Sequence, residues 1–480
     1  MRRVIAALAC AACALAFACA ASSRSTSSRP IFGVADDTGK YAEDRGAAFF
    51  SDLADLGMSE NRMAVTWDPS APTTIPDQAF LDRTVSRAFA RGIEIEFAIF
   101  PAKARALVDT PNGIQLFAQY AALVARRYPE VRRIVCLNEG NQTRFQQPQF
   151  DDADRGVAGA IQEAAMAACY DALKAVSPNI DVIGFGFSPR GGDDPDAPSN
   201  VSHSPLMFLK EIGDAYRASG RTRPIADDVA IHCYPRANSD APSVGFDWPN
   251  VGCANLDRFK QAWWDAFHGT AQPVFEEEGG RVGAHVRFVI DEAGYQAKIP
   301  SDKANLYTGS ENVPTIDDAA QGRFYAQLIA QTMCDPDVAL LNIFHLVDER
   351  SLTGWQSGLE YADGTHRASY ALVKTALSNT TCPGSIHRWH HVTNVAGARI
   401  SFLRGGRYVS IAAAEGFAYN VTVSRGARVL SSAAGTPAEG TAAVVEIPRL
   451  ARGTYRVRVK LSAITNSERT TAVVRALKRR

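Results

Sequence analysis

The chain has 480 residues, 46% of them hydrophobic, and its 51 Lys and Arg residues balance 51 Asp and Glu residues. A formal net charge of zero gives no electrostatic reason to expect nucleic acid or an anionic membrane surface as a partner. The length exceeds that of one small domain, so we expect one large domain and an accessory one.

The N-terminus predicts an export signal. Two arginines precede an apolar stretch (residues 4–18) that is short for a membrane span, and residues 18–20, Ala-Cys-Ala, have the form of a cleavage site. We therefore assign residues 1–20 to a signal peptide and the Ser-rich residues 21–30 to a linker. The protein is expected to be secreted or extracellular, with lipoprotein anchoring through Cys19 as the weaker alternative.

Strand-like and helix-like segments alternate over residues 31–382. Amphipathic stretches with apolar residues at i, i+3 and i+4 separate eight apolar segments. This alternation predicts an α/β fold, a (β/α)8 TIM barrel, whose functional residues lie at the carboxyl ends of the strands. An open doubly wound sheet also alternates, but no Gly-rich phosphate turn follows the first strand. The predicted strands are Ile31–Ala35, Asn61–Thr66, Ile93–Phe100, Arg133–Glu139, Asp181–Phe187, Val229–Tyr234, Val286–Glu292 and Val338–His345.

The pattern changes after residue 382. Short segments with period-two alternation are separated by Gly-rich turns, and residues 455–461 place apolar side chains on one face and cations on the other. We assign residues 383–465 to a small antiparallel β-sandwich. Residues 466–480 are basic, and we expect a frayed, solvated tail there.

Six of the nine cysteines follow the predicted signal peptide. They form no CxxC motif and have no neighbouring histidine cluster, so we expect no zinc site at these cysteines. In an oxidising compartment Cys233 could pair with Cys253, and Cys334 with Cys382. Buried free thiols are an equal alternative.

Two of the predicted strands end in acids. The fourth ends in Asn138-Glu139, and the seventh ends in Asp291-Glu292. Paired carboxyls can cleave a glycosidic bond, since one protonates the leaving oxygen while the other attacks or activates water. The alternative for either residue alone is a helix cap or a structural ion pair with an arginine.

These strand endings resemble the clan A retaining glycoside hydrolases, which are (β/α)8 barrel enzymes such as cellulases, β-mannanases and β-xylosidases. The resemblance implies that Glu139 is the general acid/base and Glu292 the nucleophile. It further implies that Asn138 hydrogen-bonds the sugar 2-hydroxyl. Arg62 on the second strand resembles the arginine that keeps the nucleophile ionised in this clan.

Other positions extend the resemblance. His232-Cys233-Tyr234 is similar to the clan's His-x-Tyr, which implies that Tyr234 lies near the nucleophile and His232 lines the sugar site. Two features depart from the clan: Gly140 follows Asn138-Glu139 where proline is common, and Phe344-His345 replaces the tryptophan that ends strand eight.

Aromatic residues near the strand ends are candidates for stacking on a sugar ring. Trp355 and Trp67 are the two we consider, with structural packing as the alternative for each. Among the other acids, alternation predicts that Asp291 points away from the side that Glu292 faces. Glu94 and Glu96 could project into the barrel, either as structural ion pairs or as site residues.

The sequence therefore predicts a secreted glycoside hydrolase that acts on a β-linked glycoside by double displacement. We expect a carbohydrate substrate, no metal or organic cofactor, no nucleic acid partner and a monomer. The alternative from another class is a non-catalytic, secreted carbohydrate-binding protein on a TIM-barrel scaffold. Transglycosylation would use the same residues.

Overall fold

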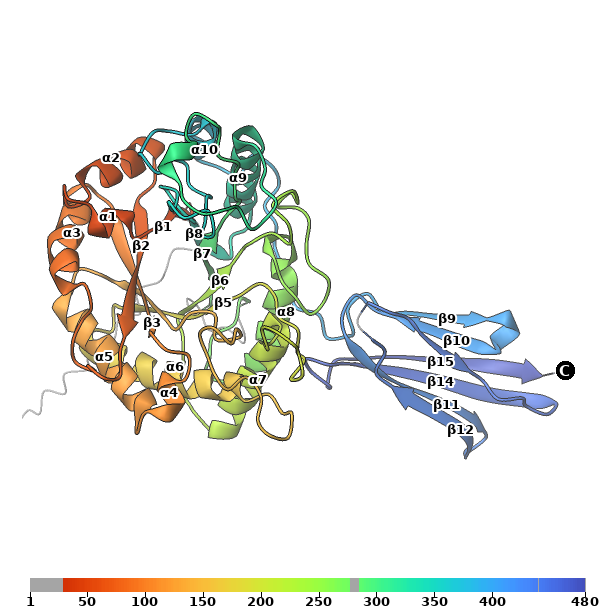
Figure 1. The fold of residues 1–480 in the computed structure, drawn as a ribbon. Coiled ribbons are helices and arrows are strands. Elements are labelled where there is room, and N and C mark those ends of the chain that lie inside the picture. The colour runs from red at the N-terminus through yellow and green to blue at the C-terminus, as the bar shows by residue number, and fades with distance from the viewer. Residues whose placement is uncertain (1–28, 277–284, 439, 480) are drawn as a thin grey trace, which may run out of the picture.

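The computed structural model describes residues 29–276, 285–438 and 440–479. The predicted signal peptide, including Cys19, and most of the predicted linker lie outside the described residues. Within the described ranges, no helix combines the length and the apolar character needed to cross a bilayer. Figure 1 shows a barrel ringed by helices, with a β-rich domain attached at one side.

The larger domain is a closed barrel of eight parallel strands in chain order, with β8 pairing back to β1. This arrangement confirms the predicted (β/α)8 fold. The strands are β1 Ile31–Ala35, β2 Glu60–Trp67, β3 Glu94–Pro101, β4 Arg133–Cys136, β5 Asp181–Phe187, β6 Asp228–His232, β7 Phe288–Ala293 and β8 Val338–Ile343. The helices are α1 Thr38–Tyr41, α2 Ala47–Leu56, α3 Gln78–Ala90, α4 Ala106–Asp109, α5 Gly113–Arg127, α6 Ala158–Val176, α7 Pro205–Ser219, α8 Leu256–Phe267, α9 Asp318–Cys334 and α10 Ala368–Leu377.

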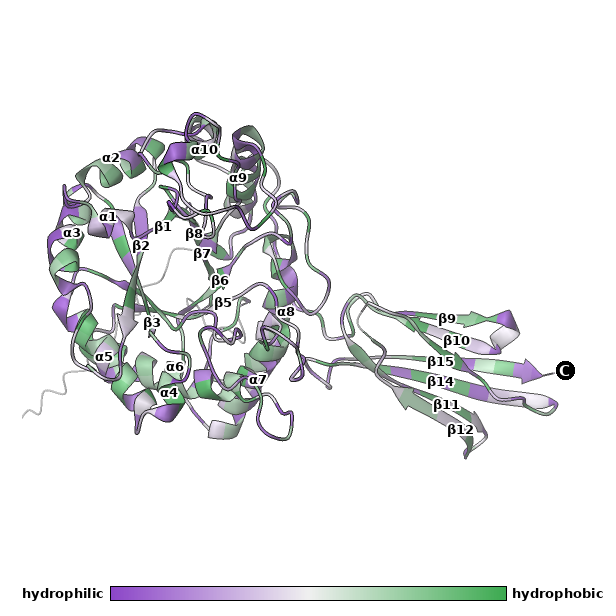
Figure 2. Cartoon of the chain, viewed as in Figure 1, coloured by the Kyte–Doolittle hydropathy of each residue, from purple (hydrophilic) through white to green (hydrophobic). Residues whose placement is uncertain are grey.

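The hydrophobic core of the barrel has two layers because strand side chains alternate between the inside and the helix-facing side. The inner layer takes small and aliphatic residues from six strands, including Ala98, Val135 and Val289. The much larger outer layer lies between strands and helices and contains aromatic residues such as Phe97 and Trp263. In Figure 2, hydrophobic and hydrophilic segments alternate along the outer helices, as expected for helices with one buried face.

The fourth strand is shorter than predicted. β4 ends at Cys136, and both Leu137 and Glu139 have positive φ angles, 74° and 39°. Two backbone hydrogen bonds of 2.8 Å hold this strained segment, because the Leu137 N–H donates to Ile99 and the Glu139 N–H donates to Gly186. The neighbouring strands thus fix the backbone of Glu139 just beyond the carboxyl end of β4.

The smaller domain contains two antiparallel sheets, in agreement with the predicted β-sandwich. One sheet has the order β13-β10-β9 and the other the order β12-β11-β14-β15. Their apolar faces share one buried cluster that includes Val409, Val421 and Val459. The strands are β9 Arg399–Leu403, β10 Tyr408–Ala412, β11 Phe417–Arg425, β12 Arg428–Gly435, β13 Ala443–Glu446, β14 Gly453–Ala463 and β15 Thr470–Arg479.

We predicted a frayed tail at residues 466–480, and this prediction is wrong for the strand formed by residues 470–479. Thr470–Arg479 form β15, which pairs with β14 along its whole length. Leu477 turns inward and is buried in the sandwich core, whereas Lys478 is exposed. The basic residues that suggested a free tail therefore lie on a solvent-facing edge strand, where charges are common.

Both predicted cysteine pairs are disulfides. Cys233–Cys253 links the end of β6 to the short helix before α8, and Cys334–Cys382 links the end of α9 to the segment after α10. The remaining cysteines of the described chain, Cys136 and Cys169, are buried free thiols.

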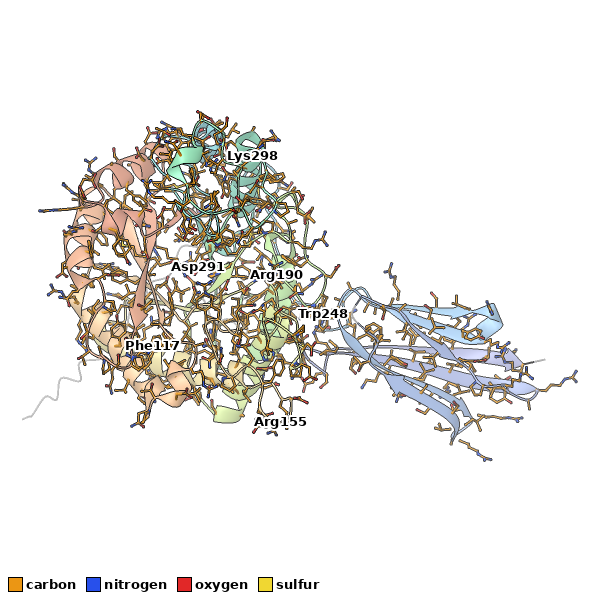
Figure 3. All side chains as sticks on the ribbon, in the orientation of Figure 1. Phe117, Arg155, Arg190, Trp248, Asp291 and Lys298 are labelled. Carbon is orange, nitrogen blue, oxygen red and sulfur yellow. A yellow bond between two sulfur atoms is a disulfide. The ribbon has the colours of Figure 1, made fainter. Side chains whose placement is uncertain are left out.

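The sandwich packs against helix α8 of the barrel. Asp265 on this helix forms an ion pair of 2.8 Å with Arg469 and accepts a hydrogen bond of 2.7 Å from Thr465. The side chains of Asp265 and Arg469 are only 1% and 2% exposed, so this ion pair is buried at the junction. Trp248, labelled at the junction in Figure 3, lies directly against Gly416, where a side chain would overlap its ring. These contacts tie the two domains together.

Candidate active site

Arg62 of β2 connects the carboxyl ends of two other strands. Its Nη1 donates to Oε1 of Glu292 at 2.9 Å, and its Nη2 donates to Oδ1 of Asn138 at 2.8 Å. Since an arginine can only donate, the Asn138 amide must present its oxygen to Arg62 and its NH₂ group elsewhere. The expected proximity of Arg62 to Glu292 is present, and the contact between Arg62 and Asn138 is an additional finding, while the sugar contact expected of Asn138 stays a prediction.

Both carboxylate oxygens of Glu292 are hydrogen-bonded. Oε1 accepts from Arg62, and Oε2 accepts a hydrogen bond of 2.6 Å from the Tyr234 hydroxyl. Desolvation, followed by the Glu292 carboxylate, raises the pKa of Tyr234 well above its ordinary value. Tyr234 thus stays a neutral donor, and the two donors hold the Glu292 carboxyl in one orientation.

His232, the last residue of β6, lies between the two glutamates. Its Nδ1 is 2.7 Å from Oε1 of Glu139 and 3.3 Å from Oε2 of Glu292, and its Nε2 is 3.4 Å from Oδ1 of Asp291. Burial alone would lower the pKa of this fully buried imidazole, but Glu292, Asp291 and the Glu139 hydrogen bond raise it well above its usual value. Both ring nitrogens thus face carboxyl groups, an arrangement that favours the protonated form of the imidazole.

Asp291 points into the same cluster as Glu292, so the predicted outward orientation is wrong. Its Oδ2 lies 3.2 Å from Arg62 Nε and its Oδ1 lies 3.4 Å from His232. The register of β7 is irregular between Ile290 and Ala293, and this irregularity breaks the simple alternation of side chains. Burial raises the pKa of Asp291, but His232 and Arg62 together lower it below the usual value. Figure 3 labels Asp291 inside the barrel.

Glu96 is a further buried ionisable group beside Arg62. It pairs in register with Arg62 across β2 and β3, and its carboxylate lies 3.9 Å from Arg62 Nε. Burial, followed by Glu60 and Asp291, raises the pKa of Glu96 well above its usual value, which favours the uncharged form of this carboxyl. Glu94, by contrast, is exposed and pairs with Arg133, so only Glu96 belongs to the site.

An aromatic group borders the nucleophile candidate. The half-buried Trp355 ring lies 4.6 Å from the Tyr234 ring and 5.5 Å from Phe344, measured between centroids. Glu349 accepts a hydrogen bond of 2.9 Å from the Trp355 backbone N–H, which fixes the loop. Trp355 thus reaches back from the loop after β8 to the place where the sequence predicted a sugar platform.

The position of Trp67 does not suit the predicted sugar contact. The side chain is fully buried, and its ring packs against Phe117 of α5 at 5.7 Å. It therefore belongs to the layer between strands and helices. Alternation along β2 explains the difference, because Trp67 is five residues from the inward-facing Arg62 and so points to the opposite face.

The glycine after Glu139 has a packing reason. A Cβ at Gly140 would lie 2.4 Å from the side chain of Gln162 on α6. The Gly140 carbonyl also accepts a hydrogen bond of 3.0 Å from Gln149. The departure from the proline of the clan thus reflects close contact with α6 and leaves Glu139 in place.

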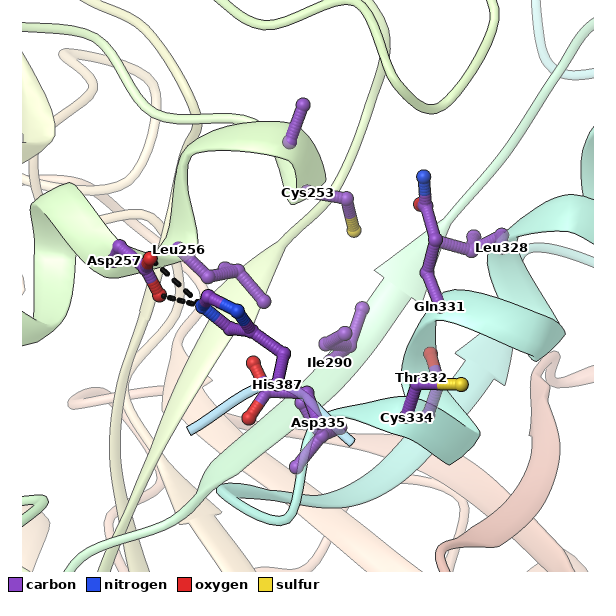
Figure 4. Close-up of a pocket in the computed structure, with 12 residues that line it drawn as sticks. Cys253, Leu256, Asp257, Ile290, Leu328, Gln331, Thr332, Cys334, Asp335 and His387 are labelled. Atoms are coloured by element: carbon purple, nitrogen blue, oxygen red, sulfur yellow. Dashed lines mark hydrogen bonds and ion pairs between the residues drawn. The ribbon is translucent and has the colours of Figure 1, made fainter. Parts of the chain in front are cut away.

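A separate pocket of about 310 Å³ lies on the outer side of the barrel, between α8 and α9 (Figure 4). Its lining includes Ile290, Leu328 and an ion pair of 2.8 Å between His387 and Asp257. The residues around Glu139 and Glu292 described above do not line this pocket. Ile290 faces this pocket while its neighbour Asp291 faces the barrel interior, so the strand β7 separates the two sites.

No protein-family model and no curated protein matches this sequence. A family 39 glycoside hydrolase from Bacteroides cellulosilyticus WH2 has a similar structure, with a TM-score of 0.50 and 13% identity over 94% of this chain and 81% of that chain. A monomeric β-xylosidase from Caulobacter crescentus CB15 gives 0.45 and 13%, over 87% and 94% of the two chains. The fold is one that glycoside hydrolases use. At this identity the similarity concerns the fold alone.

Solvent access separates the two glutamates from the other ionisable groups of the site. The side chains of Glu139 and Glu292 are 18% and 12% exposed, whereas His232 and Asp291 are 0% exposed and Arg62 is 6% exposed. A substrate can therefore touch the two glutamates, while the buried groups hold them in position. The arrangement offers two accessible carboxyls for acid, base or nucleophilic chemistry.

Proposed function

We propose that the protein is a secreted retaining glycoside hydrolase that acts on β-linked glycosides. The observation that carries the proposal is the position of one His232 nitrogen 2.7 Å from Glu139 and 3.3 Å from Glu292. The facing carboxylate oxygens are thus at most about 6 Å apart, compatible with the separation of about 5–5.5 Å that retaining enzymes use.

Each glutamate would have one role in a double displacement. Glu292, oriented by Arg62 and Tyr234, attacks the anomeric carbon while Glu139 gives its proton to the leaving oxygen. Glu139 then takes a proton from water, and that water releases the sugar from Glu292. Asn138 has its oxygen occupied by Arg62, which leaves its NH₂ group to donate to the sugar.

The decisive experiment compares the wild type with Glu292→Gln and Glu139→Gln on a panel of aryl β-glycosides. Each variant should lose about 10²–10⁴-fold in kcat, since one nucleophile or one general acid/base is removed. Glu130→Gln, on an exposed glutamate between α5 and β4, is the matched control and should keep full activity.

The products also test the mechanism. Retained anomeric configuration by NMR is expected, and an inverted product would contradict the nucleophile role of Glu292. If wild type and Glu292→Gln were equally inactive on the whole panel while sugars still bound, a non-catalytic carbohydrate-binding protein would replace this proposal. The N-terminal mass of the exported protein tests cleavage after Ala20.

A further inference from the structure

A second group of titratable side chains lies outside the barrel, where helix α2 meets the loop between β8 and α10. Asp52 belongs to α2, and Glu360 and His366 belong to the loop. One nitrogen or carboxylate oxygen from each of these residues lies within 4.8 Å of the other two. This group shares no residue with the cluster around Glu139 and Glu292.

Glu360 is the most buried residue of the group. The residue is only 2% exposed, and its Oε1 has no hydrogen-bond partner. That oxygen is directed into the group, since Nε2 of His366 lies 3.5 Å away, beyond a good hydrogen bond. A buried carboxyl oxygen without a partner is costly, so it calls for a ligand or a proton.

The local charge favours a cation. In the described part of the chain, no lysine or arginine forms an ion pair with Asp52 or Glu360. Nearby cations are engaged elsewhere, as Lys374 is with Asp55 at 2.6 Å. Two neighbouring carboxyls thus share a site whose only basic partner is an imidazole.

We propose that Asp52, Glu360 and His366 bind a divalent transition metal ion, for which Zn²⁺ is the best match. One imidazole nitrogen with two carboxylate oxygens is a donor set that suits Zn²⁺, at bond lengths of about 2.0–2.2 Å. Donor atoms around such an ion lie about 3.4 Å apart, so side-chain shifts of up to about 1.4 Å from the present limit of 4.8 Å close the site.

His366 is the residue that can make this shift. Its side chain is 47% exposed, and its ring stacks on Tyr370 at 3.6 Å, which holds it over the site. The exposed side leaves room for a water molecule as a fourth ligand. The ion would fix the loop after β8, which also carries Trp355, to helix α2. The proposal does not depend on the proposed glycosidase activity.

The test uses the full chain, stripped of metal with a chelator, and titrated with Zn²⁺ in a calorimeter. Wild type should bind one equivalent that Glu360→Gln and His366→Ala weaken by about 100-fold or more, since even outer-shell partners change metal affinity about 10–100-fold. His387→Ala removes another exposed histidine, 55% exposed and paired with Asp257, and should leave this equivalent unchanged.

Thermal unfolding separates metal binding from protonation of Glu360. In the metal-free state Glu360→Gln should unfold at the same or a higher temperature than wild type, because an uncharged amide avoids the cost of burying an ionisable carboxyl. Zn²⁺ should raise the unfolding temperature of wild type and not that of Glu360→Gln. The proposal is overturned if millimolar Zn²⁺ leaves wild type unchanged, or if Glu360→Gln and His366→Ala respond as wild type does.

Discussion

Nδ1 of His232 lies 2.7 Å from Oε1 of Glu139, which places a buried imidazole directly beside the proposed acid/base. The same imidazole faces Asp291 at its other nitrogen. The two accessible glutamates are thus supported by groups that no substrate touches. Such a buried shell fixes the orientation of the reacting carboxyls before substrate arrives.

Replacing His232 with glutamine should give a stability loss that depends on pH. The pKa of folded His232 is raised above the value of about 6.5 for an unfolded histidine, so its stabilisation is fully present below about pH 6.5 and is lost as pH rises through the raised pKa. Urea unfolding should show a loss of about 3–5 kcal/mol at acidic pH that shrinks at alkaline pH.

The exposed His387, paired with Asp257, gives the matched histidine control for this series. His387→Gln should change the free energy of unfolding by less than about 1 kcal/mol at any pH. A loss for His232→Gln that is equal at every pH would show that the imidazolium contributes nothing beyond its packing.

Arg62→Lys should lower kcat/KM by about 10–10²-fold while the protein stays folded. A lysine ammonium cannot reach Glu292 and Asn138 in the fixed fork geometry that the guanidinium provides. Steady-state kinetics on the best aryl glycoside measures the loss. Arg105→Lys, on an exposed pair with Asp109, should match wild type, and equal values for both variants would remove Arg62 from the mechanism.

The two tryptophans should respond in opposite ways to replacement by alanine. Trp355→Ala should raise KM, because the half-exposed ring beside Tyr234 would no longer stack on the sugar. Trp67→Ala should instead destabilise the fold by about 3–5 kcal/mol, since it empties a fully buried site against Phe117. A rise in KM for Trp67→Ala with unchanged stability would contradict this assignment.

Deleting Thr470–Arg479 should lower the unfolding temperature of the sandwich. The deletion removes the strand that pairs with β14 from Gly453 to Ser462, and it takes Leu477 out of the core. Calorimetry should show the change. Lys478→Ser keeps the strand, loses only an exposed charge and should stay within about 0.5 kcal/mol of wild type. A deletion variant with wild-type stability would revive the interpretation of a free tail.

Much of the barrel could be predicted because its evidence is local and repeated. Eight apolar segments alternate with amphipathic helices, and the order of Arg62, Glu139, His232 and Glu292 along them places these residues at one end of a barrel. Asp291 could not be placed, because its inward direction depends on an irregularity in β7 that alternation cannot reveal. Glu96 could have been recognised from the in-register pairing with Arg62, once the strand order was assumed.

Some strands of the sandwich were harder to predict from the sequence. β12 is rich in Ser, Ala and Gly and lacks an apolar stripe, and β15 carries its cations along an edge. Both strands are formed by pairing with distant segments, and such pairing leaves little mark on the local sequence. The buried ion pair between Asp265 and Arg469 depends in the same way on domain packing.

The two disulfides decide how this protein must be produced before any activity is judged. In a reducing bacterial cytoplasm, the cysteines of both pairs would stay reduced: Cys233 with Cys253, next to His232, and Cys334 with Cys382. Such material would carry six reactive thiols after residue 28, where the oxidised chain carries two. A thiol assay under denaturing conditions should therefore accompany each negative enzyme assay, because an inactive reduced preparation says nothing about Glu139 and Glu292.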